Sequence, residues 1–348
     1  MKVSFVIPTL NSAATLGECL DAILSQDYPR DGYEIVVADA GSSDSTLAIA
    51  KEKGVDVVCA NPLKTGEAGK AAGIEVSSGD LIALVDSDNI LPGPDWLSRM
   101  VAPFSDPAIF ASEPIRYGSR PGDPPLVRYF AGLGMNDPVC LFVGNYDRIC
   151  AVTGRWTGLD VPAVRCGGYL KVSPRAGAMP TIGANGFVFR RSILEKVRWR
   201  PYFFDIDVAA AAVDAGCGDI AKVDTSIVHL YCPRFSDFTR KQRRRIGDFL
   251  YFSKSKERTY PWRGQRKSGI LLFVLSAVTI LPLAVQAVLF ALRAPKGDRC
   301  LAWWHLPVCY ATLWIYSVGV IKRFFGVKPK MADRTNWQAD RQIKTAAN

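Results

Sequence analysis

The chain contains 348 residues, 49% of them hydrophobic, and has a formal net charge of +10. This length and apolar content indicate one sizeable globular domain with an additional segment. The nine cysteines form no Cys-x-x-Cys pair and no metal-type spacing with the two histidines. The pattern therefore argues against a zinc module and favours reduced, mostly buried thiols over a disulfide framework.

The first ninety residues alternate short apolar strands with helical stretches. Strands are predicted at residues 3–7, 34–38, 55–59 and 79–85, and each of the first three is followed by an amphipathic helix. The opening run is only about five apolar residues long before Pro8, which indicates a strand and not a signal peptide. Strict strand and helix succession predicts right-handed crossovers and a doubly wound, mostly parallel α/β sheet.

The pattern loosens after the fourth strand. Residues 92–180 are rich in Gly and Pro and predict few clear elements. A glycine turn at residues 181–186 precedes an expected edge strand at 187–191. A helix is predicted at 206–215 and a final strand at 224–230.

Positive charge is concentrated in one later segment. Residues 234–267 contain twelve Lys or Arg and three acids, and the rest of the chain is close to neutral. Nucleic-acid binding is one reading of such a run, but the sequence has no nucleic-acid-binding fold signature. Because long apolar runs follow directly, we expect this segment to lie at a membrane surface.

Two uncharged runs follow, at residues 268–292 and 301–321. They contain 25 and 21 residues, and about 20 are enough to cross a bilayer. The eight residues between them predict a hairpin, and cations outside both ends place the two termini on the cytoplasmic side. A buried helical hairpin in a soluble domain is the alternative.

This organisation predicts four parts. They are a globular domain at residues 1–233, a basic amphipathic interfacial segment at 234–267, a transmembrane hairpin at 268–321 and a cytoplasmic polar tail at 322–348.

Carboxylates gather where predicted elements begin or end. Asp86 and Asp88 directly follow a buried strand, and the carboxyl ends of parallel strands are where such sheets bind ligands. Mg²⁺ and Mn²⁺ take oxygen ligands and often share them with nucleotide phosphates. The alternative is a plain Asp-rich turn. Asp39 ends the second strand, and Asp205 and Asp207 open a later helix.

These motifs, in this order, resemble those of the inverting family 2 glycosyltransferases, which have the nucleotide-sugar-binding GT-A fold. The resemblance covers roughly residues 1–250, with Ala40 in place of an Asp and Phe204 in place of a Glu. Its matching segments are Phe5-Val6-Ile7-Pro8-Thr9-Leu10-Asn11, Val37-Ala38-Asp39-Ala40-Gly41-Ser42-Ser43-Asp44, Asp86-Ser87-Asp88 and Phe204-Asp205-Ile206-Asp207.

The resemblance implies a donor site and a metal site at the strand ends. Pro8 would lie in the donor site, and Asp39 would contact the base or ribose of the donor, although Asp39 could instead cap the following helix. Asp88 would bind Mg²⁺ or Mn²⁺, and Asp86 would contact the ribose or a metal-bound water. The metal would neutralise the departing diphosphate. His229 would face the metal or the diphosphate, with a satisfied structural histidine as the alternative.

The same resemblance assigns the catalytic base. Asp205 would deprotonate the attacking hydroxyl, because inversion needs a base opposite the leaving group. Asp207 is the second catalytic candidate, and its alternative is a helix N-terminal acid. Lys70 stands where the family often has an arginine, so it is a diphosphate candidate, with Ala71 in place of an asparagine.

The basic segment contains Gln242-Arg243-Arg244-Arg245-Ile246, which resembles the Gln-x-x-Arg-Trp motif of membrane family 2 enzymes. Gln242 would then lie in the donor site, and Arg245 would bind the diphosphate through its guanidinium group. The rival reading is an interfacial helix, with one apolar side and its other cations at the lipid.

We therefore expect a membrane-anchored, metal-dependent inverting glycosyltransferase at the cytoplasmic face of the inner membrane. It would move one sugar from a nucleotide donor, UDP-linked, to a lipid or lipid-linked hydroxyl acceptor. Two spanning helices cannot enclose a polymer channel, which argues against a processive synthase. The alternatives are a polyprenyl-phosphate glycosyltransferase and a non-catalytic, membrane-tethered subunit.

Overall fold

The computed structural model describes residues 1–255, 258–260 and 268–327, and its centre is a mixed ten-stranded sheet. The strand order is β3-β2-β1-β4-β9-β6-β10-β8-β7, and β5 pairs with β10. The expected cationic flanks at residues 261–267 and 328–348 lie outside the described residues.

The N-terminal half confirms the predicted parallel arrangement. Strands β1 (Val3–Thr9), β2 (Tyr33–Asp39), β3 (Val57–Ala60) and β4 (Leu81–Leu84) are parallel neighbours. All residues of β2 and β4 are buried, as expected for strands that are covered on both faces. The connecting helices are α1 (Ala13–Leu24), α2 (Thr46–Glu52) and α3 (Gly66–Val76).

The other half of the sheet is mixed. Strand β9 (Phe187–Arg190) lies between β4 and β6 (Ile109–Gly118) and is antiparallel to both. The prediction of an edge strand at 187–191 is therefore wrong. A short apolar run predicts a strand but does not specify the neighbouring strands. Here Phe187 and Phe189 are fully buried in the core.

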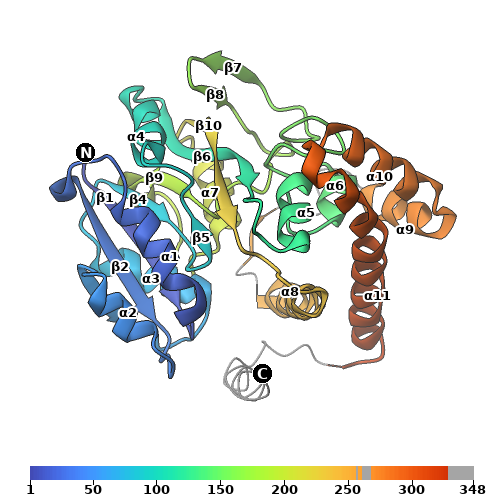
Figure 1. Cartoon of the computed structure of the whole chain (residues 1–348), viewed down its shortest axis with the longest axis horizontal. Helices are drawn as coiled ribbons and strands as arrows, with labels where there is room; N and C mark the ends of the chain where they lie inside the picture. The colour runs from blue at the N-terminus through green and yellow to red at the C-terminus, as the bar shows by residue number, and fades with distance from the viewer. Residues whose placement is uncertain (256–257, 261–267, 328–348) are drawn as a thin grey trace.

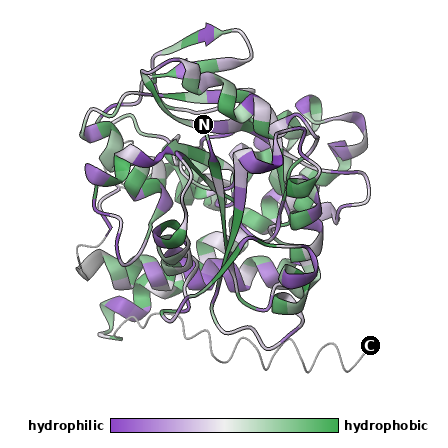
Figure 2. Ribbon diagram, turned by 90° about the vertical axis from the view of Figure 1, so that its left-hand side faces the viewer, coloured by the Kyte–Doolittle hydropathy of each residue, from purple (hydrophilic) through white to green (hydrophobic). Residues whose placement is uncertain are grey.

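The far side of the sheet is completed by β10 (Asp219–His229), which pairs with β6 in parallel. A hairpin of β7 (Ala163–Cys166) and β8 (Tyr169–Val172) forms the edge. The two-residue strand β5 (Asn89–Ile90) pairs with the end of β10. In Figure 2 the central strands carry long hydrophobic stretches, and the helices around them alternate hydrophobic and polar residues.

Further helices pack around the sheet. Helix α7 (Asp205–Asp214) confirms the predicted helix within one residue at each end. The Gly- and Pro-rich region contains α4 (Trp96–Val101), α5 (Pro125–Leu133) and α6 (Val139–Val143). Short 3-10 turns lie at Arg30–Gly32, Ala102–Ser105 and Arg191–Glu195.

The C-terminal region begins with the long helix α8 (Phe235–Ser255). The first uncharged run is two helices, α9 (Gly269–Thr279) and α10 (Leu281–Arg293), bent by 95° at Ile280. The prediction of one straight spanning helix at residues 268–292 is therefore wrong. Pro282 lies in the first turn of α10, where its missing N–H is tolerated but an unbroken helix would lose a hydrogen bond.

The second uncharged run forms one continuous rod. A 3-10 segment, η4 (Lys296–Trp304), leads into α11 (His305–Phe324). Within the described residues this rod is long and apolar enough to cross a membrane, and the bent α9–α10 pair qualifies only if it is counted as one broken span. Two transmembrane helices are thus not confirmed.

The C-terminal helices share a hydrophobic core with the globular domain. The ring of Phe290 in α10 lies 5.3 Å from that of Tyr129 in α5, and both side chains are buried. Helix α8 lies between the sheet and these helices (Figure 1). Buried apolar residues from 126–152, 231–238 and 273–309 therefore form one packed cluster.

Candidate active site

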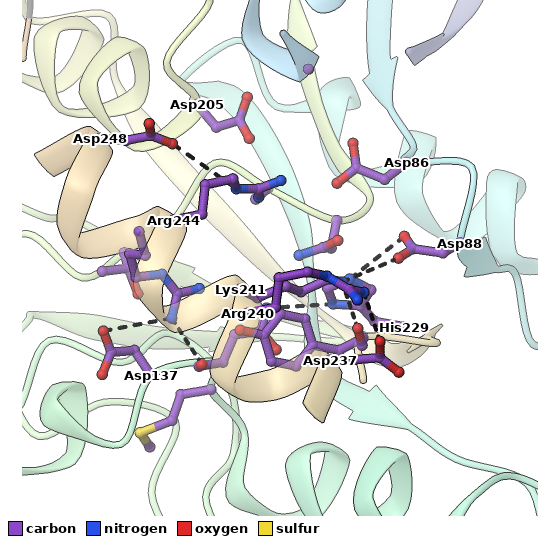
Figure 3. Close-up of a pocket in the computed structure, with 18 of the residues that line it drawn as sticks. Asp86, Asp88, Asp137, Asp205, His229, Asp237, Arg240, Lys241, Arg244 and Asp248 are labelled. Atoms are coloured by element: carbon purple, nitrogen blue, oxygen red, sulfur yellow. Dashed lines mark hydrogen bonds and ion pairs between the residues drawn. The ribbon is translucent and has the colours of Figure 1, made fainter. Parts of the chain in front are cut away.

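A cavity of about 1350 Å³ lies between the carboxyl ends of the parallel strands and helices α8, α9 and α11. Its polar end is lined by Asp86, Asp88, Asp205 and His229, which come from three separate parts of the chain. In Figure 3 these side chains point toward a common space, with α8 along one side. The predicted convergence of distant carboxylates is thus observed for these residues.

The pairing of β5 with β10 brings Asp88 to His229. Asn89 lies opposite His229 in that pairing, and the Leu230 amide donates to the Asp88 carbonyl at 2.9 Å. His229 Nε2 is 3.5 Å from Asp88 Oδ1, and Lys241 Nζ is 3.8 Å from the other carboxylate oxygen. Although burial opposes it, His229 and Lys241 lower the pKa of Asp88, so this carboxylate stays ionised.

Asp88 and His229 fit a divalent cation that is also held by substrate oxygens. A carboxylate oxygen and an imidazole nitrogen are both ligands of Mn²⁺-type ions, and such ions often share their shell with phosphates. His229 Nδ1 lies 3.4 Å from the Asn136 side-chain amide, so Nε2 is the nitrogen turned toward Asp88. No group of three His, Cys, Asp or Glu ligands occurs among the described residues.

Lys70 connects the two acidic sides of the cavity. Its Nζ lies 2.6 Å from Asp205 Oδ2 and 3.4 Å from Asp86 Oδ1. Burial opposes the charge, but the two carboxylates raise the pKa of Lys70 above its ordinary value. The predicted diphosphate ligand is therefore an ammonium group that is paired with both acids.

Asp205 lines the cavity with one carboxylate oxygen unpaired. Oδ2 accepts from Lys70, whereas the buried Oδ1 has no hydrogen-bond partner. Burial raises the pKa of Asp205 to about 7, although Lys70 works in the opposite direction. A carboxyl with a pKa near neutral and a free acceptor oxygen has the properties of a general base.

Asp207 is turned away from this space. Its carboxylate accepts from Arg258 Nε at 2.8 Å and from the backbone amides of Thr259 and Tyr260 at 2.6 and 2.8 Å. It is buried and does not line the cavity. We therefore correct its assignment as a second catalytic acid, because it holds residues 258–260 against α7.

Asp39 is occupied by its own turn. Thr9 and Ser42 hydroxyls donate to Oδ1, and the amides of Gly41 and Ser42 donate to Oδ2. These contacts hold its own turn, whereas the following helix α2 begins only at Thr46 with Ser45 as its N-cap, so the predicted helix cap is not observed. Asp39 does not line the cavity, and its contact with a nucleoside stays a prediction. Pro8, at the end of β1, does line it.

Helix α8 carries both further donor-site candidates, Gln242 and Arg245, and only Arg245 lines the cavity. Gln242 is fully buried, donates to the Asn136 carbonyl at 3.0 Å and does not line the cavity, which corrects its donor assignment. Arg245 lines the cavity, donates to the same carbonyl at 2.9 Å and lies 3.5 Å from Asp137.

Three further cations of α8 also line the cavity. The interfacial reading placed Arg240, Lys241 and Arg244 at the lipid, but they face the acids (Figure 3). The spacing of 240, 241, 244 and 245 marks one helical face, so this signal was present in the sequence. A set of positive groups beside Asp88 suits a diphosphate.

Loop residues that the sequence did not mark complete the polar wall. Asn145 and Asp147 line the cavity, and the buried Oδ1 of Asn145 has no hydrogen-bond partner. Asp147 pairs with Arg148, which also pairs with Glu113 beneath the cavity. Burial raises the pKa of Asp147 to about 6. No motif in residues 92–180 predicts this wall.

The opposite end of the cavity is apolar and open. It is lined by Phe273 and Val274 of α9 and Leu313 of α11. Three further lining residues, Ile270, Val320 and Ile321, are 61%, 54% and 53% exposed. We call these three residues the portal, because the cavity reaches the molecular surface between them.

Comparisons with known proteins agree with this architecture. The model of the family "Glycosyl transferase family 2" matches residues 4–198. Glycosyltransferase AglE of Haloferax volcanii is 36% identical over 108 residues, which is 30% of this chain and 35% of the relative. A mannosyltransferase of Pyrobaculum calidifontis, PcManGT, solved with GDP-Man and Mn²⁺, has a similar fold, with a TM-score of 0.52, 17% identity, and coverage of 93% of this chain and 87% of that one.

A third relative has a printed lipid-linked substrate. It is the dolichyl N-acetyl-alpha-D-glucosaminyl phosphate 3-beta-D-2,3-diacetamido-2,3-dideoxy-beta-D-glucuronosyltransferase of Methanococcus voltae, 42% identical over 50 residues. That alignment covers 14% of this chain and 16% of the relative. The chain thus spans about a third or less of the length of these two curated relatives.

Proposed function

The chain belongs to glycosyl transferase family 2, and from this premise we propose that it moves one sugar from a UDP-linked donor to a hydroxyl of a lipid or lipid-linked acceptor. The transfer inverts the anomeric centre and depends on Mg²⁺ or Mn²⁺. It takes place beside a membrane, on the side where the globular domain lies.

One observation carries this proposal. A single cavity joins Asp88 and Asp205 at its polar end to the exposed apolar portal of Ile270, Val320 and Ile321. A nucleotide sugar needs carboxylates and cations, whereas an acyl or prenyl chain needs apolar walls. An amphiphilic acceptor is the class of molecule that would use both ends at once.

The donor would lie along the cations of α8 and the ends of β1 and β4. Asp88 and His229 would hold the divalent ion, which supplies positive charge to the leaving diphosphate. Lys241, Arg244 and Arg245 line the same space and would contact the phosphate oxygens.

Asp205 would act as the general base. Its carboxylate would accept the proton of the attacking hydroxyl, while Lys70 holds Oδ2 and fixes the orientation of the group. This arrangement favours a hydroxyl acceptor over a polyprenyl phosphate, because an ionised phosphate has no proton to give up. The lipid-linked substrate in the name of the Methanococcus voltae relative supports a lipid acceptor.

The test uses the full chain, purified in detergent, with a panel of UDP- and GDP-sugars. We expect nucleoside diphosphate release to require Mn²⁺ or Mg²⁺, to stop with EDTA and to increase when an alkyl glycoside acceptor is present. Asp88→Asn should lose this metal response, whereas Asp95→Asn, an exposed control at the start of α4, should keep it.

Three results would contradict the proposal. Release that is unaffected by EDTA would reject the metal. Transfer to polyprenyl phosphate alone would favour the polyprenyl-phosphate alternative. No release from any donor would favour a non-catalytic role for this chain.

A further inference from the structure

The exposed apolar side chains of this protein are concentrated in one region. Eighteen of the 25 large apolar residues that are exposed in the described part of the chain lie between positions 270 and 327. We call them the C-terminal apolar surface. They are Ile270, Leu271, Leu272, Leu275, Val278, Ile280, Leu281, Val285, Val288, Leu292, Trp303, Tyr310, Trp314, Val320, Ile321, Phe324, Phe325 and Val327. A surface of this extent needs a partner or a lipid environment.

The N-terminal end of α11 is fixed to the globular domain. His305 at its start is buried, and its Nδ1 lies 2.9 Å from the hydroxyl of Tyr129 in α5. Val308 and Cys309, one turn further on, are fully buried in the core shared with α5 and α6.

The other end of α11 is fixed to α8. The hydroxyl of Tyr316 donates to Gln242 at 2.8 Å, and a Cβ at Gly319 would come within 2.9 Å of Ile246. Near the end of α11, Arg323 donates to the Leu250 carbonyl at 3.4 Å. Helix α11 therefore packs on the globular domain along its whole length.

This packing is incompatible with a spanning α11. If α11 crossed the hydrocarbon, α8 beside it would enter the bilayer as well. The face of α8 that carries Arg240, Lys241 and Arg244 lines the polar cavity, and such charges are costly at membrane depth.

The α9–α10 pair is too short and too bent to span. Helices of 11 and 13 residues are about 16 and 20 Å long, and the hydrocarbon core is about 30 Å thick. Both outer ends are fixed, because Gly269 packs on the backbone of Phe142 and Val143, and Phe290 packs on α5. Near the bend, Val278 and Leu281 are each 70% exposed.

We propose that the chain binds a single leaflet of a lipid bilayer through the C-terminal apolar surface, with the α9–α10 bend inserted and no helix crossing. The segment between α10 and α11 then stays on the side of the globular domain. Its attachments agree with this, since Arg293 donates to the Val152 carbonyl at 2.5 Å and Asp298 pairs with Arg128.

In this orientation the portal opens toward the lipid leaflet. Ile270, Val320 and Ile321 belong both to the C-terminal apolar surface and to the cavity lining. A lipid-linked acceptor could then enter sideways from the leaflet without leaving it. This last step rests on the proposed function, whereas the membrane geometry does not.

Membrane binding is tested first by flotation with vesicles of phosphatidylethanolamine and phosphatidylglycerol. The wild-type chain should float with the vesicles, and Val278→Glu with Leu281→Glu should shift most of it to the soluble fraction. Val164→Glu is the matched control, because Val164 is 65% exposed on the β7–β8 hairpin. Neither Val278 nor Leu281 lines the cavity, so nucleotide-sugar cleavage should persist in the double variant.

Topology is tested with a membrane-impermeant maleimide on sealed vesicles whose globular domain faces outward. Cys300 is the exposed native cysteine among the described residues, and Cys59, Cys166 and Cys217 are replaced by Ser to remove partly exposed thiols. A second protein carries Cys300→Ser with Lys322→Cys at the end of α11. We expect both positions to react without detergent.

Each alternative geometry gives a different result. Protection of Cys300 until detergent is added would indicate a spanning hairpin, and protection of position 322 alone would indicate that α11 spans. Failure of the wild-type chain to float would assign the C-terminal apolar surface to a protein partner. Any of these results overturns single-leaflet binding while leaving the glycosyltransferase assignment untouched.

Discussion

The two ends of the cavity are built in different ways. At the polar end, strand ends and specific hydrogen bonds fix each group, as when Lys70 holds Asp205 and the β5–β10 pairing holds Asp88 beside His229. At the apolar end, exposed side chains of α9 and α11 form a wall with few polar contacts. In the proposed function, the fixed polar groups would serve the reaction and the apolar wall would hold the lipid chain of the acceptor.

Asp205→Asn tests the polar end and should have the largest effect. An amide cannot take the proton of the attacking hydroxyl, so we expect the transfer rate to fall by about 10²- to 10⁴-fold, the usual contribution of a general base. Binding of the nucleotide sugar, measured by calorimetry, should be close to wild type. Asp214→Asn, at the exposed end of the same helix, is the control.

If Asp205→Asn loses donor binding, Asp205 would be assigned to donor binding and not to proton transfer. Turnover at the wild-type rate would remove it from the mechanism altogether.

Val320→Trp tests the apolar end and should have a smaller, selective effect. The larger ring narrows the portal, and each buried methylene of a lipid chain contributes about 0.8 kcal/mol. We expect KM for a long-chain acceptor to rise roughly tenfold, with little change for a short-chain one. Phe324→Trp is the control, since Phe324 is 84% exposed and does not line the cavity.

An equal change in KM for the long-chain and short-chain acceptors would show that the lipid chain does not bind at this end of the cavity.

Lys70→Met tests the polar end of the cavity through the pH dependence of activity. With Asp205 as the base, activity should rise as the carboxyl loses its proton, with a midpoint near its pKa of about 7. Because Lys70 lowers that pKa, its removal should move the rising limb to higher pH by about one unit or more. Lys53→Met, at the surface in a pair with Asp21, should leave the pH profile of kcat/KM unchanged. An unchanged midpoint of the rise in activity with pH in Lys70→Met would mean that Asp205 is not the group whose ionisation causes that rise.

The N-terminal half was predictable because local patterns determine it. Strands β1 to β4 are buried apolar runs, and their carboxyl ends must meet at one edge of a parallel sheet. The ends of these strands placed Asp86 and Asp88 at the cavity, whereas the family resemblance placed Asp205 and His229 there, and all four residues line it. Asp39 and Asp207 sit in the same motifs, but whether a carboxylate faces a ligand or its own backbone depends on side-chain direction, which no motif specifies.

The acceptor side was less predictable because its structure depends on long-range packing. Composition alone gave 25 uncharged residues at 268–292, but the break at Ile280 and the docking of α10 on α5 require the folded partner. The same holds for β9, whose central place in the sheet is set by β4 and β6. Asn145 and Asp147 reach the cavity from a loop region without periodicity.

A structure of the full chain with a nucleotide sugar, Mn²⁺ and a lipid-linked acceptor analogue is the most direct test of the proposed reaction. We expect the acceptor hydroxyl within about 3 Å of the Asp205 carboxylate, the usual reach of a general base, and the lipid chain between α9 and α11 at the portal. An acceptor bound with its hydroxyl away from Asp205, or with its chain on another face of the molecule, would contradict it.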